Sequence, residues 1–70
     1  MTGRVVNVHP RGFCFITRDD NEGDIYAHCS NFEDRAAFEQ LTGGERVEFA
    51  VAAERRIPGK LGALDVVVLG

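Results

Sequence analysis

A predicted β-hairpin, formed by residues 12–18 and 24–29, constrains the fold of this chain most strongly. Both segments are rich in aromatic and β-branched side chains, and the run Asp19-Asp20-Asn21-Glu22-Gly23 between them has the composition of a turn. In a β-strand, alternate residues share a face, so counting outward from the turn assigns each side chain to a face. One face, which we call the aromatic face, carries Phe13, Phe15, Tyr26 and His28. The opposite face carries Cys14, Ile16, Ile25 and Ala27.

Either face of this hairpin could turn toward the core. If the aromatic face were buried, the solvent would meet a surface of Cys14, Ile16 and small apolar neighbours that carries no strong polar group. The aromatic face is the better exposed surface, because Tyr26 and His28 carry polar atoms at the ends of their rings. We therefore expect the rings to face the solvent, where flat aromatic groups are suited to stacking on nucleobases.

The remaining elements complete a small all-β domain. Three further strands are expected over residues 4–9, 45–53 and 63–69, and a short helix over 33–41. Strict alternation cannot place Val5 and Val8 on the same face, so a bulge or bend is expected near Val6 and Asn7. We predict one domain over residues 1–70, a small five-stranded antiparallel Greek-key barrel with a helical insert between strands three and four.

Several large apolar side chains outside the hairpin are assigned to the core by the same patterns. In the last strand, Leu64, Val66 and Val68 are expected to face inward. Phe32 and Leu41, at the two ends of the helical segment, are expected to plug the barrel. For Phe38 two positions stay open, one in the core and one overhanging the aromatic face.

Composition limits the classes of function. The chain has 70 residues and a net charge of −3, which argues against a generic basic nucleic-acid-binding domain unless the acidic groups cluster away from the binding surface. No apolar run is long enough to span a bilayer, and the N-terminus lacks the apolar core of a secretion signal. We expect a cytoplasmic protein, monomeric or weakly dimeric, that does not bind membranes.

Metal, cofactor and enzyme chemistry find little support in the sequence. Cys14 and Cys29 are expected to be free thiols in a reducing compartment, and no zinc-ligand spacing joins them to His9 or His28. No nucleophile with a base and an orienting group is visible, and no glycine-rich phosphate loop. We therefore expect no cofactor, no small-molecule substrate and no enzymatic activity.

At this point the motifs resemble those of a known family, the bacterial cold-shock proteins, which are OB-fold binders of single-stranded nucleic acids. RGFCFI at 11–16 resembles the family motif K-G-F-G-F-I, and DIYAHCS at 24–30 resembles D-V-F-V-H-F-S. GGERVEF at 43–49 is similar to E-G-Q-x-V-x-F, and GRVVNV at 3–8 is similar to the opening G-x-V-K-W-F-N. The chain departs from the pattern at Asn7, where the family has a stacking tryptophan, and at Cys29, where it has a phenylalanine.

The resemblance implies binding of single-stranded RNA or DNA with low sequence specificity, and a role as an RNA chaperone or antiterminator in the cold-shock response. Mapped residue by residue, it implies stacking by aromatic groups and contacts from nearby cations. The expected binding residues are Arg11, Phe13, Phe15, Tyr26, His28, Phe38, Arg56 and Lys60. The alternative is a protein-interaction or dimerisation module on a cold-shock scaffold, suggested by the lost tryptophan and the negative charge.

Overall fold

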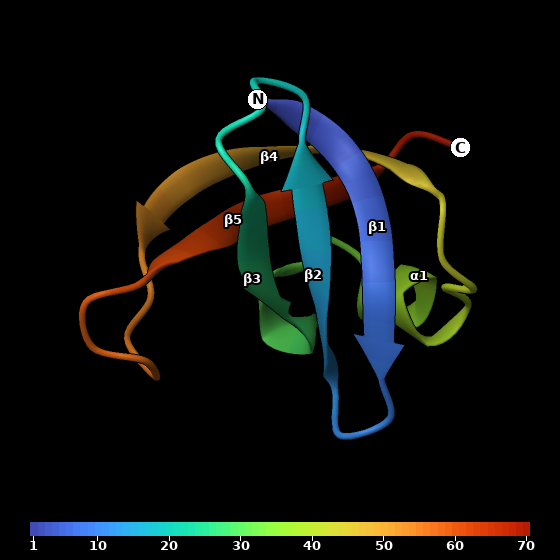
Figure 1. The fold of residues 1–70 in the computed structure, drawn as a ribbon. Helices are drawn as coiled ribbons and strands as arrows, with labels where there is room; N and C mark the ends of the chain where they lie inside the picture. Colours follow the sequence, from blue (N-terminus) through green and yellow to red (C-terminus); the bar gives the residue numbers. More distant parts are fainter.

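Five strands close into a barrel in the computed structural model, which describes residues 1–70 (Figure 1). The order of the strands around the barrel is β1-β2-β3-β5-β4, so the all-β, OB-type fold is confirmed. The elements are β1 (Thr2–His9), β2 (Phe13–Arg18), β3 (Asp24–His28), the 3₁₀ turn η1 (Cys29–Asn31), α1 (Arg35–Glu39), β4 (Arg46–Ala53) and β5 (Leu61–Val68). No helix is long and apolar enough to cross a membrane.

The seams between neighbouring strands are antiparallel with one exception. β1 pairs with both β2 and β4, β2 pairs with β3, and β4 pairs with β5, all in antiparallel register. The barrel closes where β5 runs alongside β3 in the same direction, with Tyr26 opposite Gly62. This parallel pairing differs from the all-antiparallel barrel that the sequence predicts. It follows from the long connection through α1 and β4, which returns the chain to the β3 edge.

The predicted irregularity in β1 is confirmed. Its register against β2 shifts between Val6 and His9, and Asn7 adopts a positive φ of 50°. Asparagine tolerates this left-handed conformation better than most residues, which explains why it occupies the bulge. The extra residue lets Val5, which is fully buried, and Val8, which packs against the core, turn to the same side.

In β5 the orientation predicted for Leu64 is wrong. Leu64 was expected to face inward, but 40% of its surface is exposed, whereas Ala63 and Val66 are buried. The cause is a second bulge, since Asp65 has a positive φ of 52° and the register between β4 and β5 shifts opposite it. One added residue reverses the alternation, so Leu64 lies on the outer surface of the barrel.

The helical insert is shorter than predicted. Residues 33–41 were expected to be helical, but α1 spans only Arg35–Glu39. Asp34 caps it, with its side chain accepting from the Ala36 backbone N–H at 3.0 Å. Glu33 lies outside the helix, where its N–H donates to the Val66 carbonyl at 2.9 Å, beside an isolated bridge from Phe32 to Val66.

The core consists of apolar side chains from all five strands, with Phe49 the one aromatic ring among them, and two further rings plug it at one end. Phe32 and Phe38 pack edge to face there, with ring centroids 5.3 Å apart, so Phe38 takes the core position of the two left open. Leu41 packs against this cluster, as expected. The buried set is Val5, Cys14, Ile16, Ile25, Ala27, Cys29, Phe32, Phe38, Val47, Phe49, Ala63 and Val66.

An ion pair on the surface predicts how stability depends on pH. Arg46 donates to the Asp19 carboxylate from Nη1 at 3.0 Å and from Nη2 at 2.6 Å, and the Thr2 hydroxyl donates to the same carboxylate at 2.6 Å. These bonds lower the pKa of Asp19 from its ordinary 3.8 to about 2. A lowered pKa means that ionised Asp19 stabilises the fold above pH 3.8, and that this contribution disappears as the pH falls toward 2.

We therefore expect Asp19→Asn to flatten the loss of stability between pH 4 and pH 2, the interval set by the two pKa values of Asp19. Thermal unfolding across that interval measures it. Asp65→Asn is the matched control, because Asp65 is exposed and asparagine also tolerates its positive φ. An Asp19→Asn protein whose melting temperature falls as steeply as that of the parent would contradict the assignment.

Candidate nucleic-acid interface

The aromatic face faces the solvent, as predicted from the hairpin. Cys14 and Ile16 are completely buried, while Phe13, Phe15 and Tyr26 are only partly covered. β2 pairs with β3 in the predicted register, with Phe13 opposite His28 and Phe15 opposite Tyr26. Two rows of side chains therefore cross the outer surface of the sheet, and each row presents rings from neighbouring strands.

The rings of the aromatic face are in contact with one another. Phe13 lies 5.3 Å from Tyr26, centroid to centroid, at an interplanar angle of 28°. Phe15 meets both of them edge to face, at 6.0 Å from Phe13 and 5.9 Å from Tyr26. Such contacts hold the rings in place while leaving part of each ring free, which is the arrangement that a stacking surface requires.

His9 extends the aromatic face, a contribution that the sequence analysis missed. It lies opposite Phe13 in the register of β1 and β2, and its ring stacks on Phe13 at 4.6 Å with an angle of 9°. Its position follows from the turn of residues 10–12, since counting outward from that turn pairs His9 with Phe13. The sequence signal for His9 is therefore its place one residue before the Pro10-Arg11-Gly12 turn. From here on, the aromatic face includes His9.

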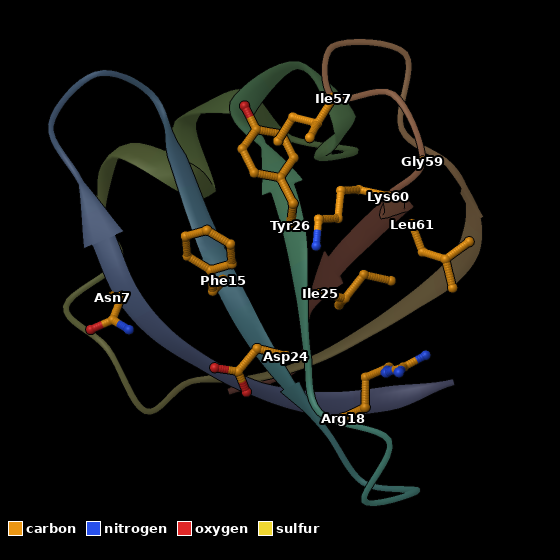
Figure 2. A pocket seen from close by; sticks show the side chains of 10 residues that line it. All are labelled: Asn7, Phe15, Arg18, Asp24, Ile25, Tyr26, Ile57, Gly59, Lys60 and Leu61. Carbon is orange, nitrogen blue, oxygen red and sulfur yellow. The ribbon is translucent and has the colours of Figure 1, made fainter.

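A hollow of about 610 Å³ borders the aromatic face and separates it from the loop between β4 and β5 (Figure 2). Phe15 and Tyr26 form one wall, and Ile57 and Lys60 reach it from the loop. In Figure 2, the Lys60 side chain extends toward the space beside these two rings. The hollow is lined by Asn7, Phe15, Arg18, Asp24, Ile25, Tyr26, Ile57, Gly59, Lys60 and Leu61.

The predicted cations occupy three different situations. Lys60 lines the hollow, and Arg11 is exposed in the turn that precedes Phe13. Arg56 is less available, because its guanidinium donates to the Glu54 carboxylate at 3.0 Å. The structure therefore brings Lys60 to the hollow beside the aromatic face, leaves Arg11 in the turn before β2, and places Arg56 in an ion pair.

Phe38 does not join the other predicted binding residues. Only 8% of its surface is exposed, because its ring fills the plug against Phe32. The part that remains accessible lines a separate, smaller hollow with Arg11 and Cys29. A ring buried to this extent offers little surface for stacking, so the structure places Phe38 apart from the exposed rings and its role in binding stays a prediction.

Burial and neighbouring charges shift the pKa values of Tyr26, His28 and Cys14 in the direction that favours their neutral forms. Burial is the main cause that raises the pKa of Tyr26, with Glu54 adding to it, so the phenol stays protonated. Burial, reinforced by Arg56, lowers the pKa of His28. Cys14, beneath the rings, has its pKa raised to about 12 by burial, and both cysteines are free thiols. No group of three His, Cys, Asp or Glu side chains is arranged to hold a metal ion.

The closed five-stranded barrel has the architecture of an OB-fold domain, and contiguous rings cross its outer surface on β2 and β3. Comparison with known proteins gives the family. The model of the 'Cold-shock' DNA-binding domain matches residues 1–69, and the chain belongs to this family, whose domains bind nucleic acids.

Individual relatives agree with this assignment. The chain is 35% identical over 60 residues to a cold shock-like protein of Aquifex aeolicus (strain VF5), which covers 86% of this chain and 80% of the relative. It is 35% identical over 52 residues to a cold shock protein of Arthrobacter globiformis, covering 74% and 76%. A probable cold shock protein of Sinorhizobium fredii (strain NBRC 101917 / NGR234) is 34% identical over 53 residues, covering 76% and 74%.

Proposed function

We propose that this protein binds single-stranded RNA or DNA with low sequence specificity, by stacking bases on the aromatic face. The observation that carries the proposal is the exposed cluster of Phe13, Phe15 and Tyr26, whose centroids lie 5.3 to 6.0 Å apart on the side of the sheet opposite the core. Every base has a flat face, so such a surface accepts strands of different sequence.

The distribution of charge supports stacking over phosphate contact as the main source of affinity. The protein carries a net charge of −3. Of the cations expected at the interface, Arg56 is already paired with Glu54, while Arg11 and Lys60 form no ion pair. About two phosphates can then be neutralised, which releases few counterions.

Two substitutions relative to the family weaken the interface. Asn7, in the place of the family's tryptophan, borders the hollow with an amide, and Cys29 is buried. Each lost stack removes about 1–3 kcal/mol. We expect dissociation constants of about 1 μM for short oligonucleotides. Weak binding of this kind melts RNA secondary structure without clamping it, which suits an RNA chaperone or antiterminator.

Salt dependence tests the balance between stacking and phosphate contact. We expect the logarithm of the binding constant for oligo-U to fall with the logarithm of salt concentration with a slope of about −1.4, the value for two phosphate contacts on a single strand. Titrations of fluorescently labelled oligo-U and oligo-dT at two salt concentrations measure it. A slope several times steeper would show that phosphate contacts dominate, and would contradict the stacking mechanism.

A second function is favoured by the outer surface of β5. Leu64 and Val67 are each 40% exposed there. A protein-interaction or dimerisation module would use such apolar positions. The same titration separates the two candidates, because an interaction module would show no saturable binding of oligonucleotides at tens of micromolar protein.

A further inference from the structure

A buried carboxylate stands at the start of the loop between β4 and β5. Glu54 is 6% exposed and is the one charged residue in the buried set. Its Oε1 accepts two hydrogen bonds from Arg56, one from the backbone N–H and one from Nη1, both at 3.0 Å. Space for it comes from Gly62, where a Cβ atom would lie 2.7 Å from Glu54 Oε2. Glu54 therefore fixes the guanidinium of Arg56 relative to the sheet.

Arg56 in turn orients the hydroxyl of Ser30. Its Nη2 donates to Ser30 Oγ at 3.0 Å. A guanidinium only donates, so Ser30 Oγ must accept in this bond, and its own hydrogen remains free for another partner. That partner is His28, whose Nδ1 lies 2.8 Å from Ser30 Oγ.

His28 Nδ1 is held as an acceptor from two directions. In addition to the hydroxyl, the backbone N–H of Ser30 donates to it at 3.1 Å. If Nδ1 carried a proton, two hydrogen-bond donors would point at each other. The ring proton of the neutral imidazole therefore lies on Nε2. The other groups that act on this imidazole are the Cys29 thiol, 3.9 Å from Nδ1, and the charges of Arg56, Glu54 and Arg35.

We propose that Glu54, Arg56 and Ser30 are positioning residues that lock His28 in its neutral Nε2–H tautomer, so that it meets the bound strand as a hydrogen-bond donor. The proposal rests on the proposed function, because the acceptor belongs to the strand: a carbonyl oxygen or ring nitrogen of a base stacked near Phe13. His28 then supplies a directed hydrogen bond at this end of the aromatic face, instead of a positive charge.

The free protein carries an internal reference for this lock. His9 Nδ1 also accepts a hydrogen bond, from the backbone N–H of Arg11 at 3.3 Å. No ion pair contacts the residue that donates it, in contrast to Ser30 beside His28. Both histidines can be followed in one ¹⁵N–¹H correlation spectrum, which distinguishes the two neutral tautomers and the imidazolium. The matched substitutions are Arg56→Ala and Arg55→Ala, which remove the same charge from adjacent exposed positions.

In the parent at neutral pH we expect His28 with an unprotonated Nδ1 and a protonated Nε2. Arg56→Ala should populate the Nδ1–H tautomer and raise the pKa of His28, because a neighbouring positive charge lowers it in the parent. Arg55→Ala should change neither, and the signals of His9 should not respond to Arg56→Ala. A parent His28 protonated on Nδ1, or equal effects of the two arginine substitutions, would overturn the proposal.

A double-mutant cycle asks whether the lock affects binding. We expect Arg56→Ala to weaken oligo-U binding roughly three- to tenfold, the effect of one hydrogen bond. In a His28→Phe background, which keeps a ring but no donor, the same substitution should have little effect. Equal losses in both backgrounds would mean that Arg56 contacts the strand directly, which overturns the positioning role. If the parent binds no strand, the proposed function fails, whereas the spectrum of the free protein still decides the tautomer.

Discussion

Phe15→Ala is expected to weaken binding of a short oligo-dT by about 5- to 150-fold, the effect of losing one base–aromatic stack. Phe15 contacts Phe13 and Tyr26 on the aromatic face, and it also lines the hollow. Its ring is only partly covered, so its removal leaves no cavity in the core. Fluorescence anisotropy measures the affinity, and the same variant should lose any ability to open RNA hairpins.

Two controls make the result for Phe15→Ala interpretable. Leu64→Ala removes an exposed side chain on β5, outside the aromatic face, and should leave affinity unchanged. Thermal unfolding of Phe15→Ala should remain cooperative, with only a small drop in melting temperature. Parent-like affinity in a folded Phe15→Ala protein would show that the oligonucleotide binds outside the aromatic face.

Ile16→Ala is expected to have the opposite effect, a loss of folding. Ile16 follows Phe15 directly but points to the other face of β2, where it is completely buried and is the largest of the fully buried side chains. Truncating a buried isoleucine to alanine destabilises a protein by about 2–5 kcal/mol. A single core of this size supplies roughly 3–5 kcal/mol in total, so the substitution should remove most of the stability and unfold a measurable fraction of the molecules.

Circular dichroism and urea unfolding measure this second effect. Leu64→Ala is again the control, because a partly exposed surface leucine should change the free energy of unfolding by only about 0.5 kcal/mol. An Ile16→Ala protein with parent-like stability would mean that Cys14 and Ile16 do not face the core. The two neighbouring substitutions in β2 therefore test the two faces of the strand independently.

The hairpin and its aromatic face could be predicted from the sequence because both depend on local rules. Strand alternation and the short acidic turn determine which side chains share a face, and the observed register pairs Phe15 with Tyr26 as expected. The bulge at Asn7 could also be inferred, since Val5 and Val8 conflict with strict alternation.

Other features lie outside such rules. Leu64 faces outward because of the positive φ of Asp65, and aspartate at that position gives no signal of a bulge. Phe38 could not be placed without knowing that Phe32 would meet it in the plug. The chain of bonds from Glu54 to His28 joins residues up to 26 positions apart, at Arg56 and Ser30. No periodicity connects residues across such distances, so only the three-dimensional structure brings them together.

The claim that single-stranded nucleic acid binds on the aromatic face is tested most directly by mapping the contact surface. Chemical shifts of the uniformly labelled protein should be followed by NMR as oligo-U is added. We predict changes centred on β2 and β3, at Phe13, Phe15 and Tyr26, with Leu64 and Val67 on the outer surface of β5 unaffected. Changes confined to the outer surface of β5, with the signals of the aromatic face unmoved at saturation, would contradict it.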